Sequence, residues 1–289
     1  MSSRDWPAPA KLNLFLHVTG RRPDGYHTLQ TVYQLLDLCD LLDIGLRDDG
    51  VITRLSGHEG VAPDHDLAVR AARLLQSRTG IRQGADLGLR KRIPAGGGLG
   101  GGSSDAATTL VALNHLWRTG LGEEDLAGLG LELGADVPLF VRGRSAWAEG
   151  IGERLTPVDL PPRWFAIVRP AVTVSTAEVF QAPELTRNSP TITIRGFLQT
   201  GGRNDCEPVV TARHPEVQRA LQWLGRSGAA RMTGTGSCVF ATFATQEQAA
   251  RALVGLPEPW QGWVARGLAA SPLAARLEAE RRAGRADLG

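Results

Sequence analysis

Pro94 to Ser104 reads P-A-G-G-G-L-G-G-G-S-S, and six of these eleven residues are glycine. Each glycine adds to the conformational entropy that folding removes, so packing alone does not explain this density. Residues 90–93 fit the end of a strand, and residues 103–107 fit a helix start, with serine caps before an acid. Such a junction binds anions through free backbone N–H groups and the positive end of the helix dipole. The stretch therefore predicts a phosphate-binding loop; a flexible linker, the alternative, rarely lies between a strand and a capped helix.

Two familiar nucleotide motifs do not fit this loop. A Walker A loop needs a lysine directly after its last glycine, whereas Lys91 precedes the loop here. A G-x-G-x-x-G pattern can be drawn through Gly96, Gly98 and Gly101, but it is weak in so glycine-rich a run. An NAD(P)-dependent oxidoreductase would also need an acid about 20 residues further on. Glu123 to Asp125 lie near that distance but look like the first turn of a helix, so this alternative is disfavoured.

Length and composition limit the class of protein. The 289 residues predict two domains, which we divide into residues 1–160 with the loop and residues 161–289. A net charge of +2 with scattered arginines disfavours a nucleic-acid partner. Three widely spaced cysteines disfavour a disulfide framework or zinc site and favour a reducing cytoplasm. We see no apolar segment of the kind that a signal peptide or membrane span needs, and expect a cytoplasmic protein.

Lys11 is the first candidate catalytic residue. The chain has two lysines, Lys11 and Lys91, and otherwise carries its positive charge on arginine. Such a chain keeps a lysine where a compact ammonium is needed, although a leftover surface lysine is the alternative. Residues 10–18 alternate apolar residues with Lys11, Asn13, Phe15 and His17, a period of two that predicts a strand. Lys11 and Asn13 should therefore share one face, opposite the leucines.

Asp136 is the second candidate. It lies in the sequence G-A-D-V-P, in a turn that Pro138 fixes, where a helix-capping or turn aspartate is the ordinary alternative. A second glycine loop follows at residues 232–238, M-T-G-T-G-S-C, between two predicted strands. Two such loops, a lone lysine and an acid fit phosphoryl transfer, which needs positioned phosphates, a cation and a carboxylate to orient the acceptor hydroxyl and take its proton. No His/Asp cluster has the spacing of metal ligands, so we name none.

The remaining pattern predicts mixed α and β structure. Residues 29–46 fit two strands or a strand with a bend, and the helix after the loop should run to Arg118. Residues 176–180 fit one helical turn, whereas residues 183–197 are rich in proline and threonine and resist assignment. The second half alternates strands and helices, which favours an α+β sandwich, and the tail from Ala274 has helical propensity.

Taken together, these segments resemble the GHMP kinases. Residues 94–104 are similar to the ATP loop of that family, and residues 232–237 to its C-terminal glycine motif. Four further segments resemble, in chain order, the branch that phosphorylates a cytidine-diphosphate derivative of methylerythritol in non-mevalonate isoprenoid synthesis. They are P-A-K-L-N-L-F-L (9–16), G-R-R-P-D-G-Y-H (20–27), L-G-A-D-V-P-L-F (133–140) and N-D-C-E (204–207).

The resemblance implies a fold of class α/β (α+β), with two domains and an active site in the cleft between them. It also implies that Lys11 and Asp136 form the catalytic pair, with Asp136 as base toward the C2 hydroxyl of the acceptor and Asn13 holding that acceptor. ATP would be the co-substrate, with Mg²⁺. The ATP phosphates would be wrapped by Pro94, Ala95, Gly96, Gly97, Gly98, Leu99, Gly100, Gly101, Gly102, Ser103 and Ser104.

For the substrate, the resemblance implies that Tyr26 and Phe180 sandwich the cytosine and that His27 hydrogen-bonds to it. Stacking on aromatic faces suits a flat base, although Tyr26 as a packing residue and Phe180 as a core residue are the ordinary alternatives. Support near the phosphates would come from Gly234, Thr235, Gly236 and Ser237. We expect a small-molecule substrate, no nucleic-acid or membrane partner, and a monomer or weak homodimer.

Two alternatives stay open. A homoserine or mevalonate type of kinase would not need a cytosine pocket, so Tyr26 and His27 could be changed there without loss. A nucleotide-binding regulatory protein would keep the loop without turnover, but loss of Lys11 or Asp136 would be its sign, and both are present.

Overall fold

The structure is a computed structural model that describes residues 2–57 and 60–286. Its strands form one ten-stranded mixed sheet with the order β3-β4-β2-β10-β7-β9-β8, onto which β1 and β5 pair through β2, and β6 through β5. The strands are β1 (Ser2–Arg21), β2 (His27–Arg47), β3 (Ile52–Ser56), β4 (Gly84–Arg90), β5 (Ala146–Glu149), β6 (Arg154–Pro157), β7 (Trp164–Arg169), β8 (Arg231–Met232), β9 (Val239–Phe243) and β10 (Gln261–Leu268).

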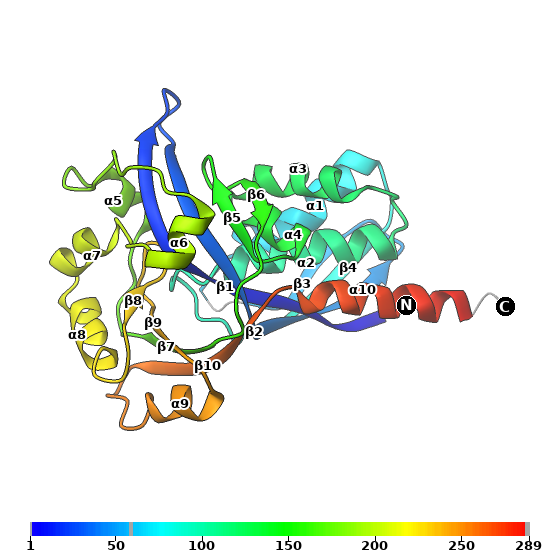
Figure 1. Ribbon diagram of the computed structural model, residues 1–289. Coiled ribbons are helices and arrows are strands. Elements are labelled where there is room, and N and C mark those ends of the chain that lie inside the picture. The colour runs from blue at the N-terminus through cyan, green and yellow to red at the C-terminus, as the bar shows by residue number, and fades with distance from the viewer. Residues whose placement is uncertain (1, 58–59, 287–289) are drawn as a thin grey trace.

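Helices cover this sheet at both ends, as Figure 1 shows. The first half contributes the 3₁₀ helix η1 (Pro63–His65) and the helices α1 (Leu67–Thr79), α2 (Gly101–Leu116), α3 (Glu123–Leu133) and α4 (Val137–Arg142). The second half contributes α5 (Thr176–Gln181), α6 (Ile194–Thr200), α7 (Glu207–Arg213), α8 (Pro215–Leu224), α9 (Gln246–Arg251) and α10 (Pro272–Ala286). Within the described ranges, no helix combines the length and apolar character needed to cross a membrane.

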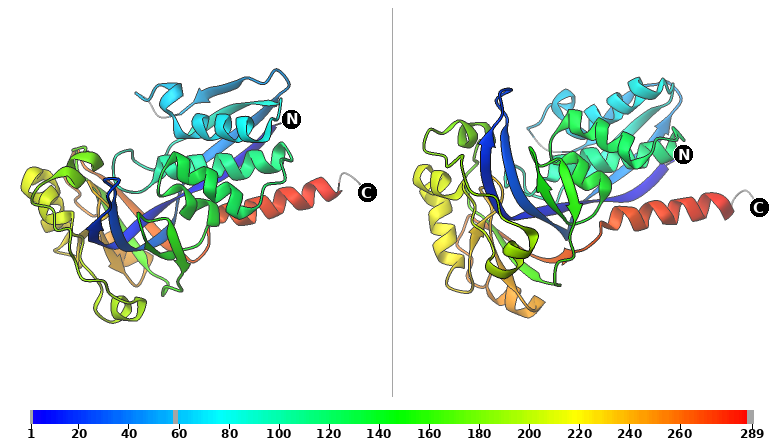
Figure 2. Two further views of the ribbon diagram at one scale, coloured as in Figure 1. Left: turned by 90° about the horizontal axis from the view of Figure 1, so that it is seen from above. Right: turned by 45° about the horizontal axis from the view of Figure 1, so that its top comes forward.

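Strand β2 ties the two halves together. It is a single strand, so the expected break within residues 29–46 is wrong. It pairs with β1 from Ser2↔Gly45 to Arg21↔His27 and also with β4, β5 and β10. The pairing of β1 with β2 has register shifts, and such irregularities bend a strand and increase its twist. The β1–β2 hairpin therefore runs past both groups of helices, as both views of Figure 2 show.

One of these shifts changes the predicted faces of β1. The register is irregular between Asn13 and Leu16, so the alternation does not continue unbroken through residue 17. Lys11, Asn13 and Leu16 line one cavity, whereas Phe15 packs on the rings of Trp147 and Phe197. The prediction that Lys11 and Asn13 share a face is confirmed. The expectation that all the leucines lie opposite them was wrong for Leu16, because a bulge adds a residue that a strict period of two does not contain.

Two main apolar cores stabilise the ends of the sheet. The first lies between α1–α3 and strands β2 and β4, and includes Leu42, Leu87 and Leu110. The second lies between α7–α9 and strands β7 and β9, and includes Val168, Val217 and Val239. Helix α10 leaves β10 and packs back on β1, where Leu273 joins the first core. The division at residue 160 stays a prediction.

Candidate active site

The glycine loop joins β4 to α2, as predicted. Helix α2 begins at Gly101, and its N-cap is Gly100, whose φ of 73° lies in the left-handed region that glycine adopts easily. No side chain caps this helix, so the prediction of serine caps was wrong; Ser103 and Ser104 lie inside the first turn. The helix begins early because the loop needs no side chain to turn, which leaves the first N–H groups of α2 free for an anion.

The two glycine loops lie directly against each other. The backbone N–H of Ser237 donates to Gly96 O at 3.3 Å, and that of Cys238 donates to Gly97 O at 3.2 Å. The contact is so close that a Cβ on Gly98 would lie 2.5 Å from the carbonyl oxygen of Thr233. The loops therefore form one backbone platform, and Leu99 O joins it to β1 by accepting from the N–H of Lys11 at 3.0 Å.

Two serines at this platform have buried hydroxyls. Among the described residues, Ser104 Oγ and Ser237 Oγ are buried without a hydrogen-bond partner. A buried hydroxyl costs free energy unless something pairs with it, so the platform suits a ligand rich in acceptor oxygens.

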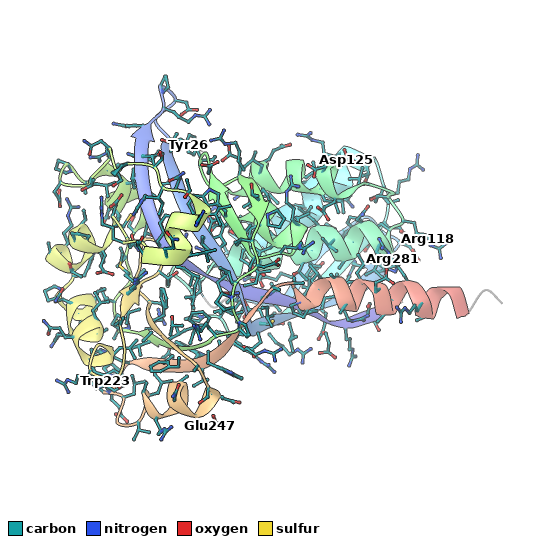
Figure 3. The ribbon with its side chains drawn as sticks, in the orientation of Figure 1. Tyr26, Arg118, Asp125, Trp223, Glu247 and Arg281 are labelled. Atoms are coloured by element: carbon teal, nitrogen blue, oxygen red, sulfur yellow. The ribbon has the colours of Figure 1, made fainter. Side chains whose placement is uncertain are left out.

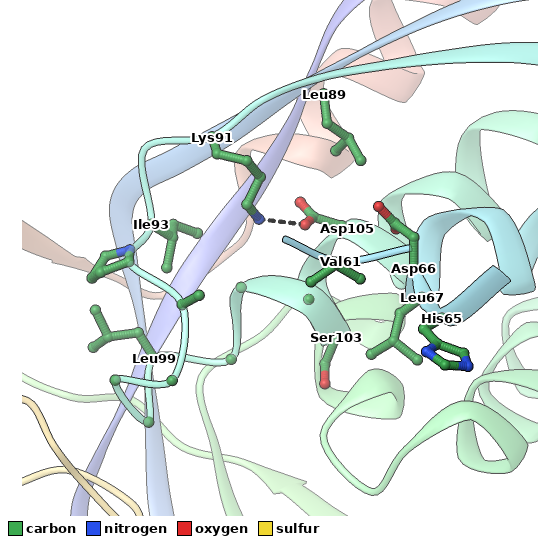
Figure 4. Close-up of a pocket in the computed structure, with 18 residues that line it drawn as sticks. Val61, His65, Asp66, Leu67, Leu89, Lys91, Ile93, Leu99, Ser103 and Asp105 are labelled. Atoms are coloured by element: carbon green, nitrogen blue, oxygen red, sulfur yellow. Dashed lines mark hydrogen bonds and ion pairs between the residues drawn. The ribbon is translucent and has the colours of Figure 1, made fainter. Parts of the chain in front are cut away.

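A cavity of about 370 Å³ opens beside the loop (Figure 4). Residues of η1 and the start of α1 line it across from the loop, and Lys91 lines it where the chain enters the loop. The ammonium of Lys91 lies 2.5 Å from both Asp40 Oδ2 and Asp105 Oδ2. Burial raises the pKa of Asp105 to about 7, because Lys91 offsets only part of that effect and the second carboxylate, Asp40, adds to it. Asp40 also accepts from the N–H groups of Arg92 and Ile93, which fixes the chain entering the loop.

Lys11 and Asp136 meet in a second cavity of about 360 Å³. Lys11 Nζ lies 3.4 Å from Asp136 Oδ2 and donates to Asn13 Oδ1 at 2.5 Å. Asp136 is the N-cap residue of α4, yet its carboxylate makes no capping hydrogen bond. The alternative of a capping aspartate is therefore excluded, and the carboxylate is left for the cavity.

Tyr33 orients that carboxylate. Its hydroxyl donates to Asp136 Oδ1 at 2.9 Å, and Lys11 Nζ lies 5.3 Å from the centre of its ring. Burial first, and then the charge of Asp136, raise the pKa of Tyr33 well above its usual value. Tyr33 therefore stays a neutral donor throughout the physiological pH range.

A third cavity, of about 460 Å³, contains the predicted aromatic residues Tyr26, His27 and Phe180. The rings of His27 and Phe180 stack with centroids 5.1 Å apart. Tyr26 is 61% exposed and follows the turn at the tip of the β1–β2 hairpin, as Figure 3 shows. One face of Phe180 thus contacts His27, and Tyr26 is the exposed aromatic ring of the three.

The three cavities run into one another. The cavity with Lys11 and Asp136 shares Gly98, Gly100 and Ser103 with the loop cavity. It shares a second group with the aromatic cavity: Leu29, Ala135, Ile151, Thr176 and Phe180. Thr235 lies at this junction, where its hydroxyl hydrogen-bonds to that of Thr176, and Gly234 lines the same cavity. A ligand that extends from the loop cavity and a ligand that extends from the aromatic cavity would therefore meet at Lys11 and Asp136.

Comparison with known proteins identifies the family. The model "GHMP kinases N terminal domain" matches residues 66–144, and "GHMP kinases C terminal" matches residues 192–262. The chain belongs to the GHMP kinases. As a member it is a small-molecule kinase with ATP as co-substrate, and the predicted α/β fold class is confirmed.

Individual GHMP kinases resemble it closely. The 4-diphosphocytidyl-2-C-methyl-D-erythritol kinase of Alkalilimnicola ehrlichii is 61% identical over 278 residues, 96% of each chain. A crystal structure of 4-(cytidine 5'-diphospho)-2C-methyl-D-erythritol kinase is 34% identical, with a TM-score of 0.79 over 92% of this chain and 99% of that one. Homoserine kinase from Cytophaga hutchinsonii is 17% identical with a TM-score of 0.68 over 93% and 95%, which shows the fold alone.

Sequence reasoning missed several residues that the structure places in or beside this candidate site. Asp40 and Asp105 escaped because single acids in a strand and a helix resemble ordinary surface residues. Tyr33 had a usable signal, since the chain has two tyrosines and both line the site. Arg187, which contacts His27, had no usable sequence signal, because it lies in the unassigned segment 183–197.

Proposed function

We propose that the protein transfers the terminal phosphoryl group of ATP to the C2 hydroxyl of 4-diphosphocytidyl-2-C-methyl-D-erythritol, a step of non-mevalonate isoprenoid synthesis. The observation that carries this proposal is the position of Lys11 and Asp136, where the loop cavity meets the aromatic cavity. Relatives that share more than half of the sequence and bear this name support the choice of substrate.

The phosphate platform would hold ATP. Its backbone N–H groups and the start of α2 suit the triphosphate, and the cavity beside Lys91 suits the nucleoside. Mg²⁺ is expected with the triphosphate, where it would neutralise charge during transfer. No group of three or more His, Cys, Asp or Glu side chains among residues 2–57 and 60–286 could hold a metal ion, so we propose no carboxylate cage for it. The buried hydroxyl of Ser104 is compatible with a hydrated cation.

Lys11, Asn13 and Asp136 would act on the acceptor. Asp136 would take the proton of the C2 hydroxyl while Tyr33 and Lys11 hold its carboxylate in place. The ammonium of Lys11 would stabilise the negative charge on the oxygens that form and break bonds. Asn13 Oδ1 accepts from Lys11 while its amide donates to Thr31 Oγ1 at 3.0 Å, so Asn13 would fix the direction of the ammonium.

Tyr26, His27 and Phe180 would bind the cytosine. A base that enters this cavity would meet the exposed ring of Tyr26 and the stacked pair of His27 and Phe180. Gly234 to Ser237 would support the phosphates from the second loop. We further propose a cytoplasmic monomer or weak homodimer, for which the free cysteines Cys39, Cys206 and Cys238 fit a reducing compartment.

The test is ADP release with ATP, Mg²⁺ and each candidate alcohol separately. We expect ADP only with the cytidine compound. ADP release with homoserine or mevalonate would support kinase activity but contradict the proposed cytosine pocket. No release with any alcohol, together with ATP binding by calorimetry, would favour a nucleotide-binding regulatory protein.

A further inference from the structure

Arg187 makes a contact that defines the chemical state of His27. Its Nε–H donates to His27 Nε2 at 3.0 Å. Arginine remains protonated and offers donors only, so Nε2 must be the acceptor and can carry no proton. His27 is then neutral, and its single N–H is on Nδ1.

The same guanidinium also hydrogen-bonds to the segment that carries Phe180. Its terminal nitrogens donate to Phe180 O at 3.0 Å, Ala182 O at 2.6 Å and Leu185 O at 3.0 Å. These carbonyls belong to the end of α5 and the turn after it. Arg187 therefore connects the strand that bears His27 with the helix that bears Phe180, and the fork geometry of arginine suits several acceptors at once.

Charges around His27 act in the same direction. Burial first, then Arg187 and Arg21, lower the pKa of His27 below its usual value. Asp24, on the hairpin turn, is the acid that lines this cavity, and its carboxylate pairs with Arg22 at 2.8 Å. His27 is therefore uncharged at neutral pH. Among the described residues, no group is found to pair with its Nδ1.

We propose that Arg187 is a positioning residue that holds His27 as an Nδ1–H donor and so makes the site select cytosine over uracil. Cytosine has an acceptor lone pair on ring nitrogen N3, whereas uracil carries an N–H there. A fixed N–H on Nδ1 of His27 can donate to N3 of cytosine. With uracil the same N–H would face the N–H on N3, so two donors would meet without an acceptor. This inference rests on the proposed function, because it concerns the base of that substrate.

The tautomer is measured directly on the unchanged protein. Histidine-labelled protein is studied by ¹⁵N NMR with long-range ¹H–¹⁵N correlation, and His27 is assigned by its loss in His27→Asn. We expect Nδ1 protonated and Nε2 unprotonated at about pH 7. Protonation of Nε2, alone or with Nδ1, would overturn the inference. This result needs neither substrate nor turnover, so it separates failure of the inference from failure of the proposed function.

Arg187→Met gives the functional test, and Arg213→Met is its control. Arg213, at the end of α7, pairs at 2.7 Å with Glu184, which lies in the same segment as Arg187. Among the described residues, Arg213 makes no hydrogen bond or ion pair with His27. In Arg187→Met the neutral imidazole can place its proton on Nε2. We expect KM for the cytidine substrate to rise about tenfold near pH 8 and the preference over its uridine analogue to fall by a similar factor. KM for ATP should change little, and Arg213→Met should match the parent protein.

The pH profile separates positioning from a purely structural role. Loss of Arg187 raises the pKa of His27 toward its usual value, and protonation returns an N–H to Nδ1. KM of Arg187→Met should therefore recover as the pH falls from about 8 to about 6, whereas that of the parent stays flat over this range. A loss of equal size at every pH, with unchanged base preference, would show that Arg187 only supports α5 and would overturn the inference.

Discussion

Neighbouring side chains set the geometry of Lys11 and Asp136. Lys11 is 5% exposed at its side chain and Asp136 is 29% exposed, so the cation is held inside while the carboxylate still reaches the cavity. Asn13 and Tyr33 each contact one member of the pair. Tyr33 holds Oδ1 of Asp136 and Lys11 lies beside Oδ2, so the proposed base is fixed in place and each oxygen keeps a lone pair for an acceptor hydroxyl.

Asp136→Asn removes the proposed base and keeps the shape of the site. We expect turnover to fall by about two orders of magnitude or more, because general-base catalysis contributes on that scale. The dissociation constant for ATP, measured by calorimetry, should stay within about twofold, since the carboxylate lies outside the loop cavity. Asp159→Asn, at an exposed position, is the control. Near-normal turnover of Asp136→Asn would refute the base assignment.

Tyr33→Phe tests the positioning of that base. The change leaves Asp136 Oδ1 without its buried donor, so we expect kcat to fall about tenfold with little change in KM for ATP. Steady-state kinetics with ATP and the alcohol varied in turn measures this. An unchanged kcat would mean that Lys11 alone orients the carboxylate.

At the scale of elements, the backbone platform depends on two loops far apart in sequence. Their mutual hydrogen bonds replace the side-chain contacts that glycine lacks. Gly98 has a φ of 75° and lies against the backbone of the second loop, so it is required both for its conformation and for its size. The platform is thus a tertiary contact and not a property of either loop alone.

Gly98→Ala should separate the two loops. The new Cβ meets backbone atoms that cannot rotate away, so we expect the free energy of unfolding to fall by about 1–3 kcal/mol and ATP binding to weaken. The control is Gly128→Ala, where the new Cβ meets no atom within 4 Å. Gly128 lies within helix α3, and alanine there should raise the free energy of unfolding by about 0.5–1 kcal/mol. Urea unfolding compares both, and equal effects would contradict the platform.

Across the whole molecule, the last helix, α10, packs against the first strand, β1. Strand β1 begins in the first core, and α10 packs against it after the chain has passed through the second half. The guanidinium of Arg276 lies 4.7 Å from the centre of the fully buried ring of Trp6 and donates to Glu280 Oε1 at 2.7 Å. This contact closes the fold and holds the start of the strand that carries Lys11.

Arg276→Ala should loosen that closure. We expect a loss of about 1 kcal/mol in the free energy of unfolding, from the cation–π contact and the packing of the arginine stem. The control Arg282→Ala removes an arginine of the same helix whose side chain is 83% exposed, and it should change stability little. Thermal unfolding of both variants measures the difference, and equal shifts would show that α10 contributes through helix content alone.

Local patterns predicted the elements with strong signals. The strand around Lys11, the glycine loop followed by a helix, strand β9 at Val239–Phe243 and the helical tail were all expected, because periodicity and glycine density are properties of neighbouring residues. The errors were local as well: the bulge after Asn13 and the uncapped start of α2 involve backbone geometry that residue types do not specify.

The sequence by itself determined the kinds of groups available for the chemistry: a loop of free N–H groups, a lone lysine, an acid in a turn and aromatic residues near a hairpin tip. Only the tertiary structure decided their distances. Lys11 and Asp136 are 125 residues apart in the chain, and Arg187 is 160 residues from His27, yet each pair is in contact. Those contacts depend on the pairing of β2 with both halves of the sheet, because long-range strand pairing fixes positions that no local pattern encodes.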